Sequence, residues 1–404
     1  MKKIYLDNNA TTPIHPEVLD AMLPYLKDEF GNPSSIHWAG RNTRRGVDDA
    51  REKTAKLLNC DASEIIFTSC GSEGNNLAIK GVAESKKDKG NHIITTKVEH
   101  PAVLSTCKYL QKPGFDVTYL DVDSEGMLDL DQLKKAITPK TILITIMFAN
   151  NETGVIFPIE EIGKIAKGHN ISFHTDAVQA AGKIPIDEKK MNIDLLTISG
   201  HKLYAPKGVG ALYVKRGVRL TPLIQGGHQE RNRRGGTENV AGIVALGKAC
   251  EIAQRDMPEE IKHLAALRDR LQKGLMEKIA HVRLNGHPTK RTPNTVNLSF
   301  EYAEGESLLL NLDMKGIAAS SGSACTSGTL EPSHVLVAMG VPLEASHSSV
   351  RFSLGRGNTV EDIDYVIEVM PAMVERMRSM SPLYSTITGK GTDITFAESG
   401  SHSH

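Results

Sequence analysis

The chain has 404 residues, of which 40% are hydrophobic, and its Lys+Arg and Asp+Glu totals are both 48. Such a chain can bury a large core but exceeds one ordinary domain, so a large domain with a smaller one is expected. The balanced charge argues against nucleic acid as a partner, because nucleic-acid binding needs a positive excess.

No stretch approaches the roughly 18 apolar residues of a membrane span, and the N-terminus lacks the apolar centre of a signal peptide. The cysteines are odd in number and no two are spaced as C-x-x-C, so neither a disulfide framework nor a zinc knuckle is indicated. The sequence therefore predicts a cytoplasmic protein with free thiols and no membrane as a partner.

The first two thirds of the chain alternate helical and strand patterns. Helices are predicted over 16–30, 41–58, 77–84, 103–110, 130–137 and 159–167. Short apolar runs predict strands over 65–68, 92–95, 117–120, 142–147, 171–174, 195–199 and 208–214. Repeated strand–helix alternation indicates an α/β fold, in which helices flank a mostly parallel mixed sheet.

The pattern changes near residues 256–258. A long helix is predicted from 259 to about 279, then strands over 295–300, 317–320 and 348–353, and a last helix over roughly 360–380. We therefore predict a large domain over 1–256, whose first 15 or so residues pack on a smaller α+β domain over 257–380. The remainder, 381–404, is rich in Ser, Thr and Gly and is expected to be a mobile tail.

Polar residues follow three of the predicted strands. Small residues after 65–68 precede a helix, whose free N–H groups suit a phosphate, although helix capping by Ser72 is the alternative. Asp176 follows a second strand and either binds a cationic ring nitrogen or caps a helix. Lys202 follows a third, and it is either a Schiff-base amine or an ordinary solvated lysine.

A phosphate site, an acid for a ring nitrogen and an amine for an aldehyde are the three features that pyridoxal 5'-phosphate (PLP) requires. PLP is therefore the predicted cofactor. Nucleotide-binding glycine motifs are missing, and so is H-E-x-x-H, which leaves a metal hydrolase built from the 15 histidines a distant alternative. No catalytic metal is predicted.

The chain resembles the cysteine desulfurases of the class-V aminotransferase fold, which serve nitrogen fixation and general iron–sulfur assembly. The resemblance runs from Tyr5 to Arg356 and implies fold type I of the PLP-dependent transferases. Its motifs are 98–103, 149–154, 174–179, 199–202 and, above all, the Ser/Gly-rich run 320–328 around Cys325. One departure is Cys70-Gly71-Ser72, where relatives often have Gly-Ala-Thr, although the Ser72 hydroxyl can still serve a phosphate.

The resemblance implies a role for each motif residue. Lys202 bonds to the PLP aldehyde and moves the substrate Cα proton, and Asp176 accepts the pyridinium N–H. His100 lies flat against the PLP ring and moves the substrate thiol proton. The other implied ligands are Gln179 and Asn151 for the phenolic oxygen, Gly71, Ser72, Ser199 and His201 for the phosphate, Asn151 and Arg351 for the substrate carboxylate, and Thr237 for the phosphate of the other subunit in a homodimer.

Cys325 is implied to attack the sulfur of L-cysteine as a thiolate, which leaves L-alanine and a persulfide. An iron–sulfur cluster scaffold protein is the implied acceptor, and Cys325 can contact a cluster during transfer. Among the remaining cysteines, Cys60, Cys107 and Cys250 fit the pattern of buried hydrophobes, and Cys70 is expected to be structural.

Two rival functions remain open at this point. A PLP aminotransferase or lyase acting on serine or selenocysteine would share every cofactor residue and differ at Cys325. A non-catalytic scaffold that kept the fold would have no need of Lys202, which is present.

Overall fold

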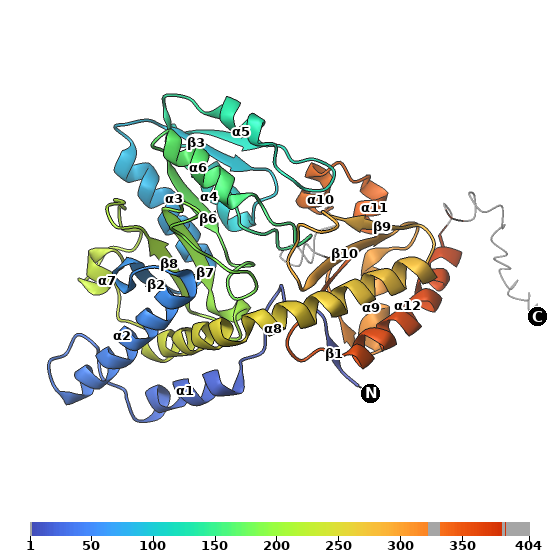
Figure 1. Cartoon of the computed structure of the whole chain (residues 1–404), viewed down its shortest axis with the longest axis horizontal. Helices are drawn as coiled ribbons and strands as arrows, with labels where there is room; N and C mark the ends of the chain where they lie inside the picture. Colours follow the sequence, from blue (N-terminus) through green and yellow to red (C-terminus); the bar gives the residue numbers. More distant parts are fainter. Residues whose placement is uncertain (1, 322–331, 382–383, 385–404) are drawn as a thin grey trace, which may run out of the picture.

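The computed structural model describes residues 2–321, 332–381 and 384, and Figure 1 shows their arrangement. Cys325 lies outside the described residues, as does the predicted tail apart from 381 and 384. Two lobes lie side by side in the view, joined by one long helix and by the segment that follows the N-terminus. Among the described residues, every helix is too short or too polar to span a membrane.

A seven-stranded sheet with the order β2-β8-β7-β6-β5-β3-β4 forms the centre of the larger lobe. Of these strands, only β8 runs antiparallel to its neighbours, so the predicted mostly parallel sheet is confirmed. The carboxyl ends of the other strands therefore meet at one edge. The strands are β2 Ile65–Thr68, β3 His92–Thr96, β4 Asp116–Leu120, β5 Thr141–Thr145, β6 Ser172–Asp176, β7 Leu195–Ser199 and β8 Gly210–Val214.

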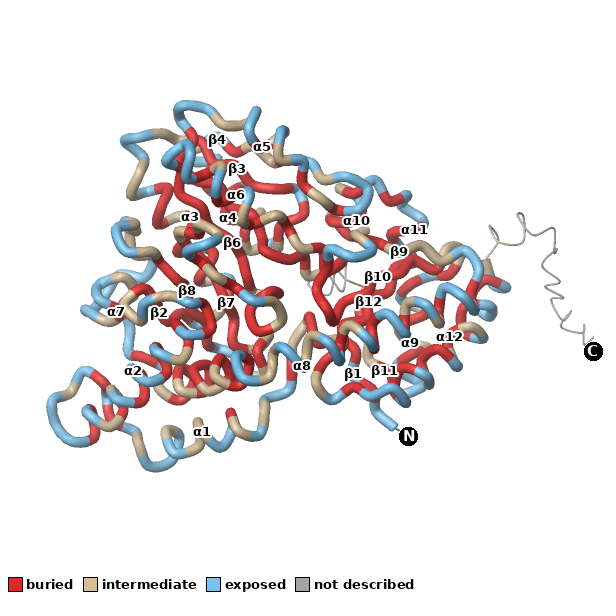
Figure 2. The backbone as a smooth tube through the Cα atoms, viewed as in Figure 1, coloured by how far each residue is buried: buried red, intermediate tan, exposed pale blue. Residues whose placement is uncertain are grey.

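Helices cover both faces of this sheet because successive strand residues point to opposite sides. Ile66 packs with α3 and α4 in one apolar cluster, whereas Ile65 and Phe67 pack with α2 and α6 in another. Figure 2 shows the sheet as a buried layer between partly exposed helices. The helices of this lobe are α1 Pro16–Lys27, α2 Trp38–Leu58, α3 Gly71–Lys86, α4 Pro101–Gln111, α5 Leu130–Ala136, α6 Ile159–Gly168 and α7 Gln229–Asn232.

The smaller lobe contains an antiparallel sheet with the order β12-β10-β9 and a parallel pair, β1 with β11. Its apolar core includes Ile4 and Leu6, so the N-terminal segment packs here. The elements are β1 Ile4–Tyr5, β9 Val282–Asn285, β10 Thr295–Phe300, β11 Ile317–Ala318, β12 Ser349–Ser353, α9 Gly305–Met314, α10 His334–Ala338, α11 Leu343–His347 and α12 Val360–Ser379.

Several helix boundaries differ from the predictions, and α3, for example, begins at Gly71 rather than at 77. Helix α8 runs from Val240 to Lys278 with Pro258 inside it, so the predicted start at 259 is wrong. Its first half packs on the core of the larger lobe and its second half on that of the smaller lobe, and the predicted boundary at 256/257 falls within it. Helix α1 ends at Lys27 rather than at Gly31. A Cβ at Gly31 would lie 2.2 Å from the Ala39 carbonyl oxygen, so this glycine permits close packing on α2.

Candidate active site

A cavity of about 370 Å³ lies where the carboxyl ends of the parallel strands meet, the usual position of ligand sites in open α/β sheets. Most of the predicted site residues line it together with Asn9, Ala10 and Asn75, which sequence reasoning did not single out. The predicted residues in the lining are Gly71, Ser72, His100, Asn151, Asp176, Gln179, Ser199, His201, Lys202 and Arg351. Thr237 does not line the cavity, and Cys325 lies outside the described residues.

The N-terminus of α3 forms one end of the cavity. Cys70 occupies the capping position without a capping hydrogen bond from its side chain, and Ser72 lies inside the first turn, so capping by Ser72 is wrong. A Cβ at Gly71 would lie 2.9 Å from Val178 Cγ2, which explains a glycine at this close approach. The buried Ser199 hydroxyl has no hydrogen-bond partner among the described residues. Free helical N–H groups and unpaired hydroxyls suit an anion.

Asp176 ends β6 and lines the floor of the cavity. Its Oδ2 accepts a hydrogen bond from Asn75 Nδ2 at 2.6 Å, and its Oδ1 accepts one from the Val178 N–H at 3.0 Å. The second bond is the local turn contact expected of a cap, and no helix of the described chain begins there. Both hydrogen-bond donors are neutral, so neither of these contacts supplies the positive partner that a cationic ring nitrogen would be.

Lys202 stands in a short 3₁₀ turn directly after β7. Its Nζ donates to the carbonyl oxygen of Asn9 and, at 2.6 Å, to that of Ala10. The side chain is partly buried in the cavity wall, so the alternative of an ordinary solvated lysine is wrong. Every residue type has a backbone carbonyl group, so the sequence of the segment 7–12 gave no signal of this contact.

His100 follows β3 and sits at the N-terminus of α4. Its Nδ1 accepts from the Ala102 N–H at 3.1 Å, which leaves the hydrogen of the neutral ring on Nε2. Burial lowers the pKa of His100, the nearby Lys202 and His334 lower it further, and Asp176 opposes them. The ring is therefore neutral near pH 7 and able to accept a proton from a substrate.

Glu99 lies behind His100 and is fully buried. It accepts hydrogen bonds from Thr96 Oγ1 at 2.8 Å and from the Met147 N–H at 3.0 Å. Burial raises the pKa of this carboxyl to about 8, despite the lowering effect of these two hydrogen bonds. Glu99 is therefore protonated in the folded protein near pH 7.

Glu99→Gln is expected to flatten the pH dependence of folding stability. An acid whose pKa rises from 4.5 to about 8 on folding lowers the free energy of unfolding as pH rises between these values. The slope is about 1.4 kcal/mol per pH unit for one group. Urea unfolding at pH 5.5, 6.5 and 7.5 measures it. A variant that lost stability as steeply as the wild type would contradict the protonated carboxyl.

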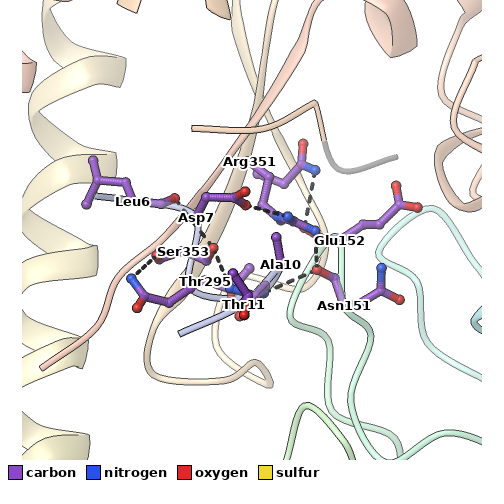
Figure 3. A network of polar contacts seen from close by, with 12 residues as sticks. Leu6, Asp7, Ala10, Thr11, Asn151, Glu152, Thr295, Arg351 and Ser353 are labelled. Atoms are coloured by element: carbon purple, nitrogen blue, oxygen red, sulfur yellow. Dashed lines mark hydrogen bonds and ion pairs between the residues drawn. The ribbon is translucent and has the colours of Figure 1, made fainter. Parts of the chain in front are cut away.

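Arg351 comes from β12 of the smaller lobe and lines the cavity, and Figure 3 shows the polar contacts around it. Its side chain is almost fully buried, with Nη2 2.7 Å from Asp7 Oδ1 and Nη1 3.0 Å from the Asn151 carbonyl oxygen. This ion pair is largely buried, so it is not a surface contact. The chain next to Asp7 is also fixed to the smaller lobe, since the Asn9 N–H donates to Ser353 Oγ at 2.9 Å.

Two more predicted residues complete the lining. Gln179 Nε2 donates to the Asn9 carbonyl oxygen at 3.0 Å. His201 Nδ1 lies 3.2 Å from Thr11 Oγ1, and burial, aided by Lys202, lowers its pKa to about 4. His201 is thus a neutral hydrogen-bonding group at pH 7.

The four described cysteines differ in exposure. Cys107 and Cys250 are fully buried, as predicted, and burial raises the pKa of each thiol to about 12. Cys60 was predicted to be buried as well, but it is only partly buried against the core, and burial still raises its thiol pKa. Cys70 lines the cavity, which makes it the described thiol nearest to the predicted chemistry.

The model of the family described as "Aminotransferase class-V" matches residues 4–366. The chain belongs to the aminotransferase class-V family. Within this family it is 58% identical to "Cysteine desulfurase IscS" of Methanosarcina thermophila over 95% of this chain and 94% of that protein. It is also 58% identical to "Cysteine desulfurase" of Nostoc sp. over 96% of this chain and 97% of that one.

Solved structures of class-V proteins agree with the fold. The structure titled "NIFS-LIKE PROTEIN" superposes with a TM-score of 0.88 at 40% identity, covering 93% of this chain and all of that one. The structure titled "SspA in complex with cysteine" superposes with a TM-score of 0.78 at 39% identity, covering 87% of this chain and 99% of that one. In the described part of the chain, no cluster of three or more His, Cys, Asp or Glu could hold a metal ion.

Proposed function

We propose that this chain is a PLP-dependent cysteine desulfurase that converts L-cysteine to L-alanine and passes the sulfur to Cys325 as a persulfide. The observation that carries the proposal is the gathering of ten predicted site residues around one cavity at the carboxyl edge of the sheet. The names of relatives with 58% identity over nearly the full chain support it. An iron–sulfur cluster scaffold protein would then receive the sulfur in the cytoplasm.

The cavity residues fit PLP by their chemistry. The unpaired Ser199 hydroxyl and the N-terminus of α3 at Gly71 and Ser72 would hold the phosphate, together with His201. Asp176 would hold the ring nitrogen, and Gln179 and Asn151 the phenolic oxygen. When bound, PLP would supply an aldehyde that bonds to amines and a ring that withdraws electrons from the substrate Cα.

The chain's own groups would then move the protons. The Lys202 amine lies at the cavity wall, where it donates hydrogen bonds to two backbone carbonyl groups. Once these hydrogen bonds break, the amine would take the Cα proton of the substrate. His100 is neutral, with its hydrogen on Nε2 and Nδ1 engaged by the Ala102 N–H. It would accept the thiol proton of the substrate only after the ring turns or the hydrogen moves to Nδ1 and frees the other nitrogen.

Arg351 and Asn151 would bind the substrate carboxylate. A guanidinium pairs with a carboxylate in a planar fork, and here Asp7 already supplies such a carboxylate to Nη2. Substrate would share or replace this contact. Asp7 therefore holds the guanidinium in place while the cavity lacks substrate.

Sulfur transfer needs one nucleophile and no external oxidant. The Cys325 thiolate would attack the substrate sulfur, a new S–S bond would form, and the Cβ–S bond would break with its electron pair staying on Cβ. Protonation of Cβ then gives alanine, and the sulfur leaves as the persulfide of Cys325. The sum is L-cysteine plus a thiol giving L-alanine plus a persulfide, which balances in atoms and electrons.

The proposal is tested by adding L-cysteine to the purified protein without a reductant and measuring alanine and protein-bound persulfide. We expect about one persulfide per chain in a first turnover, with alanine in equal amount. Pyruvate and free sulfide in place of alanine would favour the rival lyase. Faster turnover of serine than of cysteine would equally reject the desulfurase.

Asp176→Asn is expected to lower turnover at least tenfold with PLP still bound. The change keeps the shape and the Asn75 contact but removes the charge that would hold a protonated ring nitrogen. Losing a charge-assisted hydrogen bond costs about 1.5–3 kcal/mol, and about 1.4 kcal/mol is tenfold in rate. Steady-state alanine production measures the loss. Turnover equal to the wild type would remove Asp176 from this role.

A homodimer is the proposed assembly, with Thr237 serving the phosphate of the neighbouring subunit. Thr237 is exposed and lies away from the cavity of its own chain. Exposed apolar side chains on and before α2 support an interface, since Phe30, Ile36 and Trp38 are 79%, 91% and 62% exposed.

Ile36→Glu combined with Trp38→Glu is expected to weaken this dimer. Charges placed in an apolar interface lose hydration without gaining partners, so association should fall by at least tenfold. Sedimentation velocity over a dilution series measures the change. Leu310→Glu, at a 68% exposed position on α9, is the matched control. A wild-type monomer with full activity would reject the shared site.

A further inference from the structure

Lys183 lies on the turn after β6, and no step described above uses it. Its Nζ donates to Gln179 Oε1 at 3.2 Å and to the Gln179 carbonyl oxygen at 3.4 Å. Across the described part of the chain, no carboxylate lies within 4.0 Å of this amine. Gln179, which lines the cavity, is therefore its hydrogen-bonding partner.

The two contacts of Gln179 fix the direction of its amide. Lys183 can only donate when charged, so the amide atom that faces it must be the oxygen. The Asn9 carbonyl can only accept, so the atom 3.0 Å from it must be the nitrogen. Both contacts select the same orientation. One N–H of Gln179 is used on Asn9, and the other remains for a group in the cavity.

The surroundings of Lys183 do not favour its charge. Burial lowers the pKa of Lys183 to about 7, the charges of Lys202 and Arg351 lower it as well, and Glu260 alone raises it. A cation placed near two other cations, with an amide as its partner, contributes little to stability. Ionisable groups in such positions are typical of functional sites.

We propose that Lys183 is a positioning residue, which holds the Gln179 amide with its N–H groups directed at the cofactor site. The inference rests on the proposed function, because the phenolic oxygen of PLP is the acceptor that the remaining N–H would meet. Without Lys183, the Asn9 carbonyl alone would hold the amide, which would then turn more often and present Oε1 to that oxygen. Two acceptors would then face each other, and the cofactor would bind more weakly.

The test is the affinity of the apoprotein for PLP, measured by absorbance or fluorescence titration without substrate. Lys183→Met keeps the length of the side chain and removes the donor, so we expect binding about three- to tenfold weaker. Lys183→Arg keeps a donor and should stay within about twofold of the wild type. Lys86→Met is the matched control, because Lys86 is also a partly buried lysine with a lowered pKa, bonded to Ser172 at the other end of the sheet.

A double-mutant cycle shows whether Lys183 acts through Gln179. Gln179→Leu should weaken PLP binding by itself, and adding Lys183→Met should then change nothing further. Additive effects would overturn the proposal, and so would wild-type affinity in Lys183→Met. Should Lys183→Met fail to fold, the loss of affinity in Lys183→Arg would overturn it. A wild-type chain that bound no PLP would reject the proposed function as well, so the two failures are distinguishable.

Discussion

Lys202→Ala is expected to abolish covalent attachment of PLP and to lower alanine production by about 10²- to 10⁴-fold, the usual range for a lost acid–base group. The structure places this amine in the cavity wall, where its hydrogen bonds go to the carbonyl groups of Asn9 and Ala10. Alanine at position 202 has no amine to bond with an aldehyde or to carry the Cα proton. The variant should therefore lack the yellow colour of the attached cofactor, should not retain the cofactor after borohydride reduction, and should lose turnover.

Peptide mapping of the borohydride-reduced protein identifies the attached lysine. Lys183 is the natural competitor, because it lies near Lys202 and its pKa is lowered to about 7. Cofactor found on Lys183, or on any lysine other than Lys202, would make the assignment wrong. Lys86 lies at the opposite end of the sheet, so the Lys86→Met variant should retain both the cofactor colour and the turnover of the wild type.

The site was predictable from the sequence where it follows the strands. Asp176 and Lys202 come directly after β6 and β7, and the turn at Gly71 comes after β2. Parallel strands bring these positions to the same edge, so residues far apart in the chain could be placed together before any coordinates were known. The family motifs then supplied roles that position alone leaves open.

The contacts made by the N-terminal segment were not predictable in this way. Asn9 and Ala10 lie on no strand of the central sheet, and they line the cavity because the segment that follows β1 crosses from the smaller lobe. Their contribution comes partly from backbone carbonyl groups, which every residue type possesses. No side-chain pattern therefore marks the acceptors of Lys202.

The full length of α8 was also not predictable from the sequence. Pro258 within a polar stretch suggested a new helix, yet the helix begins at Val240, and the side chain of the capping residue Asn239 accepts from the Gly242 N–H at 3.1 Å. Proline lacks one hydrogen bond in a helix interior, and packing of Leu246 and Leu271 on two separate cores offsets that loss. The continuous helix is therefore stabilised by tertiary burial, which cannot be read from a local sequence pattern.

Cys325→Ala is expected to stop alanine and persulfide production while PLP and L-cysteine still bind. Removal of the Cα proton needs no protein thiol, whereas breaking the Cβ–S bond needs a nucleophile that takes the sulfur. Small Ser and Gly residues surround Cys325 in the sequence, which predicts an accessible thiol. The variant should therefore change the cofactor absorbance when cysteine is added and then stall.

The decisive control for Cys325 is Cys70, because its side chain lines the cavity and offers the rival thiol. Cys70→Ala should keep most of the turnover, and Cys250→Ala should change only stability, since that thiol is fully buried. Alanine release and persulfide labelling, followed by mass mapping of the modified peptide, separate the two candidate thiols. If Cys325→Ala released alanine at the wild-type rate, or if the persulfide lay on Cys70, the sulfur transfer proposed for Cys325 would be wrong.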